Sequence, residues 1–352
     1  MRESRLCSAG NRKELDTDMI GRRLLGIDLG TDLVKVYQKG SGIVLQEKDI
    51  VATKGKHTIA IGNKAYAMLG RAPQEIILSK PIQNGVIGHM GYMQSLLNAL
   101  FKQIFQRTVR KTDVLVAVPK DITAVEKRAF FEALEHANSK IGALYAIDKP
   151  LLNALGMNLN ISDSKGLMTV DIGADTTEIA IVSLEGIVVS KLLPIGGYKL
   201  DTLIQSAVRR THHLCIGEKT AEMIKVSLAS AIAPLKQEEI RVYGRDIMTG
   251  LPTDAMVGSS LVYEAIREQF SAIMNAIRQI LERTPPEIAA DIIESGIFVS
   301  GGCAGIRDLG KKIQEETNLK VHIADQSQNA VIRGLGVLVD NYKMLRIGKR
   351  IR

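Results

Sequence analysis

The chain has 352 residues, of which 45% are hydrophobic and 24% are charged, as is typical of a globular protein with two domains or one large bilobed unit. Its formal net charge of +8 would suit an anionic partner, but the absence of Trp and an aromatic content of 4% argue against a surface that stacks nucleic-acid bases. The three cysteines show neither metal-site spacing nor a disulfide pattern, and no stretch approaches the roughly 20 apolar residues that cross a bilayer. We therefore expect a cytoplasmic protein that binds no nucleic acid and contacts a membrane only peripherally.

Positive charge gathers at the two ends of the chain. Residues 1–23 are polar, basic and without period, so we expect a disordered basic lead, and residues 346–352 form a basic tail. Two interpretations stay open, because such tails are either simply solvated or attracted to the anionic inner leaflet of a membrane.

Short apolar runs and helical periodicity predict alternating strands and helices. In chain order, the first half is expected to form strands at 24–27, 33–37 and 42–45, a helix at 93–105, a strand at 114–118, a helix at 123–138 and a helix from Pro150 onward. The second half is expected to form a strand at 166–170, helices at 200–210, 220–229 and 259–283, and a strand at 297–300. This alternation indicates an α/β fold.

One short unit occurs twice. Asp28-Leu-Gly-Thr-Asp follows the first strand, and Asp171-Ile-Gly-Ala-Asp follows the strand that opens the second half. Each unit leads into another strand and then into a Gly-Ile-Val segment. An internal repeat of this kind predicts two similarly folded lobes, each opening with a strand–turn–strand hairpin.

The first copy suits phosphate binding. Gly30 lets the backbone approach a ligand closely, and the loop N–H groups and the Thr31 hydroxyl are donors for phosphate oxygens. A carboxylate such as Asp28 holds Mg²⁺ through water, because this ion keeps most of its hydration shell. Lys35 follows at a spacing that would return its ammonium to a phosphate. Taken alone, the motif is equally well an ordinary hairpin with an exposed aspartate.

The second copy supplies the matching half of a site. Asp171 and Gly173, followed by Thr176 and Thr177, repeat the arrangement, so a cleft between the lobes would hold a nucleoside triphosphate from both sides. The turn at 301–302, two glycines after a strand, adds a third close backbone approach, suited to the adenosine end. The chain has no Walker P-loop and no dinucleotide-binding glycine pattern.

The two Asp-Gly loops and the late Gly-Gly turn, in this order, resemble the actin–sugar kinase–chaperone ATPase superfamily. Within it, the chain is similar to the MreB family of bacterial actin-like proteins over nearly all of residues 24–340. The resembling segments are 40–45, 61–71, 84–87, 118–128, 216–225, 244–252 and 284–293. The resemblance implies an α/β, actin-like ATPase fold, in which two related ribonuclease H-like lobes form four subdomains around a nucleotide cleft.

The resemblance also implies domain boundaries and a function. Lobe I would comprise residues 24–150 and 331–345, with a small subdomain at about 53–82, and lobe II residues 151–330, with a small subdomain at about 198–254. ATP and Mg²⁺ would be the cofactors. Head-to-tail filaments on the inner face of the cell membrane would guide cell-wall synthesis and rod shape. The partners would be further copies of the chain and membrane proteins of cell-wall elongation, or another MreB.

The same resemblance assigns candidate site residues one by one. Asp28 and Asp171 would hold Mg²⁺ through water, and Thr176 would position the attacking water. The phosphate contacts would come from Asp28, Gly30, Thr31, Asp32, Lys35, Asp171, Gly173, Ala174, Asp175, Thr176 and Thr177. The nucleoside contacts would come from Glu222, Lys225, Gly301, Gly302, Cys303 and Ala304. Lys35 departs from the usual MreB residue but is similar to the phosphate lysine of actin.

Other departures from the family pattern fall within this candidate site. The second loop usually reads Asp-Ile-Gly-Gly-Gly-Thr-Thr-Glu, but Ala174 and Asp175 replace its second and third glycines. Asp175 would bring a carboxylate near the γ-phosphate, and two like unit charges about 4 Å apart repel by roughly 4 kcal/mol at an effective dielectric near 20. Lys149 stands where the family has the glutamate that positions water, and an ammonium is a poor general base. The segments 301–306 and 326–328 also differ from the family pattern.

These opposite charges lead to a hypothesis about activity. We expect Lys149 and Asp175 to lie close together and pair, in a chain that binds ATP with weak or absent hydrolysis. Two functions stay open: an ATP-dependent filament of the MreB class, and a degenerate paralogue that regulates or copolymerises with an active MreB. A chaperone-type ATPase is disfavoured because no substrate-binding domain follows the core. A sugar kinase is disfavoured because its catalytic Asp and its sugar-binding insertions are missing.

Two further patterns have simple structural interpretations. The segment 106–112 is short and basic and lacks the hydrophobic tip of a membrane loop. The apolar stripe that precedes it is therefore expected in the core; it comprises Leu97, Leu100, Phe101, Ile104 and Phe105. The adjacent His212 and His213 are expected at a solvated helix end rather than at a metal ion.

Overall fold

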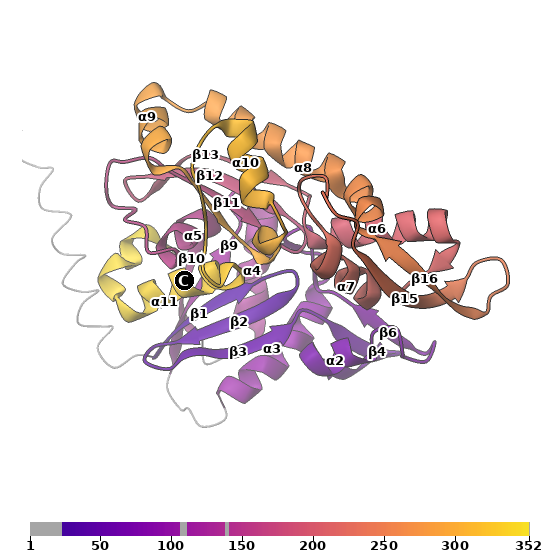
Figure 1. The fold of residues 1–352 in the computed structure, drawn as a ribbon. Coiled ribbons are helices and arrows are strands. Elements are labelled where there is room, and N and C mark those ends of the chain that lie inside the picture. The colour runs from indigo at the N-terminus through magenta and orange to yellow at the C-terminus, as the bar shows by residue number, and fades with distance from the viewer. Residues whose placement is uncertain (1–22, 106–110, 138–140, 352) are drawn as a thin grey trace, which may run out of the picture.

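The computed structural model describes residues 23–105, 111–137 and 141–351. The prediction for the lead at 1–22 and most of the basic segment 106–112 lie outside these residues. The described chain contains two large sheets and two small three-stranded ones, together with a two-stranded ribbon of β7 (Ile82–Gln83) and β8 (Val86–Ile87). In Figure 1, the first part of the chain forms the lower half of the molecule and most of the second part forms the upper half.

The first large sheet carries the first Asp-Gly loop. Its strands are β1 (Arg23–Leu29), β2 (Leu33–Gln38), β3 (Gly42–Lys48), β9 (Thr112–Val118), β10 (Ile141–Asp148) and β19 (Lys349–Arg350), in the order β19-β10-β9-β1-β2-β3. β1 runs antiparallel to β2 and parallel to β9, which in turn runs parallel to β10. The carboxyl ends of β1, β9 and β10 therefore meet at one edge of the sheet, where ligands bind in open α/β sheets.

The second large sheet repeats this arrangement. Its strands are β11 (Leu167–Ile172), β12 (Thr177–Ser183), β13 (Gly186–Leu193), β17 (Ile297–Ser300) and β18 (Val321–Ile323), in the order β13-β12-β11-β17-β18. β11 runs antiparallel to β12 and parallel to β17, as β1 does to β2 and β9. The predicted internal repeat is thus confirmed as two related strand–turn–strand units, each at the start of a large sheet.

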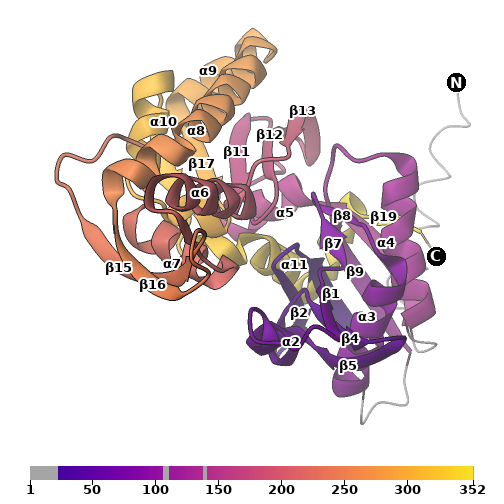
Figure 2. The same cartoon turned by 90° about the vertical axis from the view of Figure 1, so that its right-hand side faces the viewer.

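Two helices lie between the large sheets, as Figure 2 shows: α5 (Lys149–Gly156) and α11 (Ala330–Asp340). They approach so closely that a Cβ on Gly156 would lie 1.8 Å from the Ala330 carbonyl oxygen, and one on Gly334 would lie 2.0 Å from that of Leu152. Only glycine fits at these two positions. The core around these helices includes residues of both large sheets, among them Leu115 and Val182, so the two halves share a packed centre.

Each half also carries a small sheet far from this centre. In the first half, β4 (Val51–Lys54) lies between β5 (His57–Ile61) and β6 (Ile76–Ser79), and α2 (Gly62–Met68) packs on β4 and β5. In the second half, α6 (Gly197–His212) and α7 (Glu218–Leu228) accompany β14 (Leu214–Cys215), β15 (Glu239–Asp246) and β16 (Pro252–Gly258). The small sheets and their helices lie on the same side of the molecule and face each other (Figure 1).

The remaining α-helices cover the outer faces of the large sheets, whereas two short 3₁₀ helices contact β17 of the second large sheet. The α-helices are α3 (Met90–Ile104), α4 (Ala124–Ala137), α8 (Ser259–Glu282), α9 (Pro286–Ser295) and α10 (Leu309–Thr317). The two 3₁₀ helices are η1 (Gly302–Gly305) and η2 (Ser327–Asn329), and a further one is η3 (Tyr342–Ile347). The apolar stripe on α3 is buried, with Leu97 and Phe101 each 1% exposed, so its assignment to the core is confirmed. Within the described part of the chain, no helix is both long and apolar enough to span a bilayer.

The two adjacent histidines, His212 and His213, lie at the end of α6. α6 ends at His212, and His213 follows in the left-handed conformation with φ 51°, so the predicted helix end is confirmed.

The basic tail is partly folded, because Lys349 pairs with Ala146 of β10. Arg346 forms an ion pair with Glu185. These tail residues are therefore held by the second half and by the edge of the first sheet.

Candidate functional site

The first Asp-Gly loop is a tight turn between β1 and β2. The Gly30 N–H donates to the Leu33 carbonyl oxygen at 3.1 Å, and a Cβ on Gly30 would lie 2.7 Å from that oxygen, so the turn requires glycine. Asp28 and Lys35 are directly paired across the two strands, and both side chains are buried. Burial lowers the pKa of Lys35 below its ordinary value, although Asp28 opposes this shift. The Lys35 ammonium donates to the carbonyl oxygen of Gln328, so it already has a backbone partner.

The second loop has the same turn. The Gly173 N–H donates to the Thr176 carbonyl oxygen at 2.8 Å. The Thr177 side chain is buried, and its hydroxyl donates to the Ile195 carbonyl oxygen at 2.7 Å, which holds the loop against the segment before α6. The Tyr198 N–H donates to the Ala174 carbonyl oxygen, so the start of α6 and the loop are fixed together.

In the second loop, Asp171 is paired across the strands with Glu178, as Asp28 is with Lys35. Glu178 is 4% exposed, and its Oε1 accepts the Lys120 N–H at 2.7 Å. Burial raises the pKa of Glu178 to about 8, despite that hydrogen bond and the attraction of Lys149. Glu178 was missed among the predicted site residues, although the repeat aligns it with Lys35. That alignment is the signal by which it could have been found.

Asp171 is enclosed by groups from other elements. The buried Ser300 hydroxyl, at the end of β17, lies 3.0 Å from Asp171 Oδ1 and 3.0 Å from the side-chain oxygen of Asn153 on α5. Burial raises the pKa of Asp171, and Lys149 and Ser300 act in the opposite direction. Asn153 and Ser300 are further site residues that the motifs did not indicate.

Lys149 lies at the first position of α5, at the edge where the parallel strands end. Its Nζ is 3.3 Å from Asp28 Oδ1, and the two side chains are 16% and 11% exposed. Burial lowers the pKa of Lys149, but the carboxylates of Asp28, Asp171 and Glu178 offset this effect and leave a net rise. The group at this position is therefore a stable cation and is unsuited to accept a proton from water.

The predicted pairing of Lys149 with Asp175 is wrong. Lys149 is paired with Asp28, whereas Asp175 Oδ2 accepts the backbone N–H of Asn84 at 2.7 Å. Strand order explains the difference. Asp28 is level with Ala117 on β9, and Asp148 is level with the next residue of β9, so Lys149 leaves the sheet beside Asp28. Asp175 instead faces the turn between β7 and β8.

The residues predicted for the nucleoside end gather around the start of α6. Gly301 has φ 91°, and a Cβ there would lie 2.3 Å from the Ile172 carbonyl oxygen, so this turn requires glycine. A Cβ on Gly197 would lie 3.0 Å from Lys225 Nζ and 3.1 Å from Cys303 Sγ, which shows how closely these groups converge. Lys225 also pairs with Asp201 at 2.8 Å. Burial raises the pKa of Cys303 to about 11, so its thiol is neutral.

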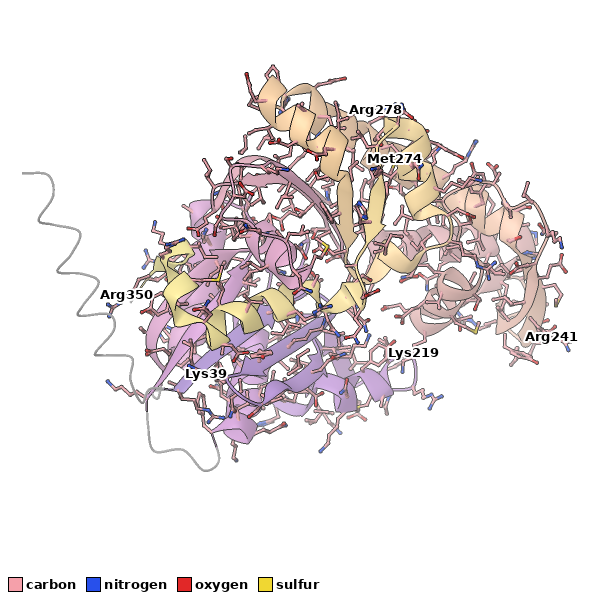
Figure 3. All side chains as sticks on the ribbon, turned by 60° about the vertical axis from the view of Figure 1, so that its left-hand side comes forward. Lys39, Lys219, Arg241, Met274, Arg278 and Arg350 are labelled. Carbon is pink, nitrogen blue, oxygen red and sulfur yellow. The ribbon has the colours of Figure 1, made fainter. Side chains whose placement is uncertain are left out.

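The two halves are bridged by contacts between α2 of the first half and α7 of the second. The Tyr66 hydroxyl donates to Glu222 Oε2 at 3.0 Å, and Lys219 Nζ donates to the Tyr66 carbonyl oxygen at 2.7 Å. Figure 3 labels Lys219 where the two halves face each other. A further bridge between the halves joins the start of α6 to the first loop, where the Tyr198 hydroxyl donates to Asp32 Oδ1 at 2.8 Å. Burial and the nearby carboxylates raise the pKa of both tyrosines.

Comparison with known proteins identifies the fold and the family. The sequence profile of the family described as MreB/Mbl protein matches residues 22–347. The chain belongs to the MreB/Mbl family. It is 38% identical over 327 residues to the cell shape-determining protein Mbl of Bacillus subtilis (strain 168), an alignment that covers 92% of this chain and 97% of that protein. It is 37% identical over 328 residues to the cell shape-determining protein MreB of Escherichia coli (strain K12), covering 91% and 94%.

The structural comparison agrees. MreB5 of Spiroplasma citri, in a crystal structure bound to ADP, matches with a TM-score of 0.87 at 32% identity, covering 93% of this chain and 98% of that one. The predicted family and the actin-like fold are therefore confirmed. The roles predicted for individual MreB site residues stay predictions.

Magnesium, which the MreB family implies, fits this site poorly. The ion requires several oxygen ligands and keeps part of its water shell. Asp28 and Asp171 would supply two carboxylates, but the Lys149 ammonium already lies against Asp28 and is attracted by Asp171. A hydrated dication would have to share this buried position with a cation. Within the described ranges, no group of three or more His, Cys, Asp or Glu side chains is arranged to hold a metal ion.

Proposed function

We propose that the chain is a cytoskeletal protein of the MreB class that binds ATP in the cleft between its lobes and forms filaments. The observation that carries this proposal is the pair of facing Asp-Gly loops, one from each large sheet, joined at the base by α5 and α11. Backbone N–H groups and the Thr31 and Thr176 hydroxyls would hold the phosphates. The nucleoside would lie against the turn at 301–304. The related MreB5 protein is bound to ADP.

The proposed filaments would act at the inner face of the cell membrane, with cell-wall elongation proteins as partners. This part of the proposal is supported by family membership and by the relatives named as cell shape-determining proteins. The basic residues at the ends of the chain offer charge for an anionic lipid surface. Arg346 contributes little to such a surface, because it is paired with Glu185.

A second candidate function is favoured by one observation, the ion pair of Lys149 and Asp28. A lysine held as a cation does not activate water, so ATP would be bound and hydrolysed only weakly. Thr176 would still position a water, but Lys149 stands where the family has the glutamate that would act on that water. The chain would then regulate an active MreB or copolymerise with it, using nucleotide as a structural element.

Nucleotide titration of the purified chain tests the shared part of both functions. Gly302→Leu is expected to weaken ATP binding by at least roughly tenfold, because the new side chain fills the nucleoside end. Gly305→Leu is the matched control: both glycines belong to η1, and a Cβ at either position meets no atom within 4 Å. Absence of saturable ATP binding in the unmodified chain would refute the proposal.

Electron microscopy and phosphate release separate the two functions. Filaments of the chain alone with ATP, accompanied by phosphate release, support the autonomous filament. Filaments that form only with an active MreB, without phosphate release from this chain, support the regulator.

A further inference from the structure

Lys149 lies where the proposed nucleotide phosphates would meet the acidic groups of the two loops. The side chain extends from the start of α5, where Pro150 fixes the backbone, and it is largely enclosed. Its Nζ lies 3.3 Å from Asp28, which belongs to the first loop. Asp171 and Glu178, on the opposite lobe, are the next carboxylates that act on it. The ammonium therefore lies between the acidic groups of both loops.

Two lysines offset much of the negative charge of the carboxyl groups at this site without a metal ion. We call Asp28, Lys35, Lys149, Asp171 and Glu178 the cleft charge cluster. The two ammonium groups formally cancel the two aspartates. Glu178 also occurs in the usual family loop, so it does not contribute to the difference in charge between this chain and the family. The glutamate that the family has at position 149 would make the cluster two units more negative. That difference equals the charge of one divalent cation.

We propose that the Lys149 ammonium takes the place of the divalent cation, so that this chain binds its nucleotide with no requirement for Mg²⁺. This inference rests on the proposed nucleotide-binding function and specifies how that site neutralises phosphate. The ammonium has three N–H donors, of which the carboxylate of Asp28 engages one side, so donors remain for phosphate oxygens. The cluster is therefore expected to bind the nucleotide without a metal ion.

Nucleotide affinity, measured in excess magnesium chloride and again in EDTA, tests whether binding requires Mg²⁺. The unmodified chain is expected to change its dissociation constant by less than about threefold between the two conditions. Lys149→Met should lose affinity by at least about tenfold in EDTA and recover most of it in magnesium chloride. Lys149→Arg, which keeps the charge, should behave as the unmodified chain does. A tenfold loss in EDTA for the unmodified chain would overturn the inference.

Lys127→Met provides a matched control. Lys127 Nζ pairs with Asp148 Oδ1 at 3.0 Å, and its side chain is 28% exposed, so this lysine is a partly buried neighbour that lies outside the cluster. Its replacement should leave the response to EDTA unchanged. A metal requirement that appears equally in both lysine variants would show that loss of any nearby charge creates it, and this outcome would contradict a specific role for Lys149.

A measurement without nucleotide separates failure of the inference from failure of the proposed function. Mn²⁺ should raise the thermal unfolding midpoint of Lys149→Met, whose carboxylates are uncompensated, but not that of the unmodified chain. Addition of Asp28→Asn to Lys149→Met should remove the effect. If no nucleotide binds under any condition, the proposed function fails. An equal rise with Mn²⁺ in the unmodified chain and in Lys149→Met would then also refute the inference.

Discussion

Glu178 should make the stability of the protein depend on pH, and Glu178→Gln should remove this dependence. The residue is 4% exposed, and burial raises the pKa of its carboxyl group from 4.5 to about 8. A shift of this size corresponds to about 5 kcal/mol, since one pKa unit is about 1.4 kcal/mol. The folded-state pKa is raised, so the full stability is present below the unfolded pKa, near 4.5, and is lost as pH rises toward 8. Gln keeps an oxygen that accepts the Lys120 N–H but never ionises.

Urea unfolding of the two proteins at a series of pH values between 5 and 9 measures this contribution, with the range chosen to bracket the folded-state pKa of about 8. Asp49 also contributes to the pH dependence of stability, because burial raises its pKa to about 8. This contribution is the same in the unmodified chain and in Glu178→Gln. The comparison of Glu178→Gln with the unmodified chain therefore isolates Glu178, and Asp49→Asn gives the second component separately. Parallel curves of unfolding free energy against pH for the unmodified chain and Glu178→Gln would refute the reasoning.

Three further substitutions test other parts of the structure. Tyr66→Phe removes the hydrogen bond to Glu222 and should weaken the contact between α2 and α7 by about 1 kcal/mol, seen as a larger radius of gyration in solution scattering. An unchanged radius would contradict this prediction. Gly334→Ala places a Cβ 2.0 Å from the Leu152 carbonyl oxygen and should destabilise the chain by about 3 kcal/mol in urea unfolding; a loss under about 0.5 kcal/mol would show that α5 and α11 separate freely. Asp175→Asn removes a charge near the proposed phosphate position and should raise ATP affinity at least about tenfold in a binding titration, whereas unchanged affinity would contradict that position.

The fold could be predicted because its signals are local or repeated. Each strand of the two hairpins is a short apolar run, and the copy at Asp171 repeats the copy at Asp28, so the two-lobed plan follows from the sequence. The close crossing of α5 and α11 could not be predicted in this way. It depends on Gly156 and Gly334, which are far apart in the chain and gain meaning only when the two helices meet.

The site could be predicted only as a set of residues, not as a set of pairs. The sequence indicates both unusual charges, Asp175 within the second loop and Lys149 before Pro150, but their partners depend on which strand ends lie side by side. β10, β9 and β1 run parallel, so Lys149 meets Asp28. Asp175 accepts the backbone N–H of Asn84. Because nearly every residue has such a donor, the sequence does not indicate which one Asp175 contacts. Pairing rules based on charge alone therefore gave the wrong partner.

The two copies of the hairpin carry opposite charges at matched positions, and this difference links the lobes. Lys35 compensates Asp28 within the first copy, whereas Glu178 leaves the second copy doubly acidic whenever it ionises. The compensating cation for the second copy, Lys149, belongs to the connection that follows β10 of the first sheet. Separation of the lobes would therefore draw Lys149 away from Asp171 and Glu178 and remove the attraction by which it lowers the pKa of both carboxyl groups. In the proposed nucleotide complex, phosphate would compete with the same carboxylates for the ammonium, and this competition would couple nucleotide binding to the separation of the lobes through one side chain.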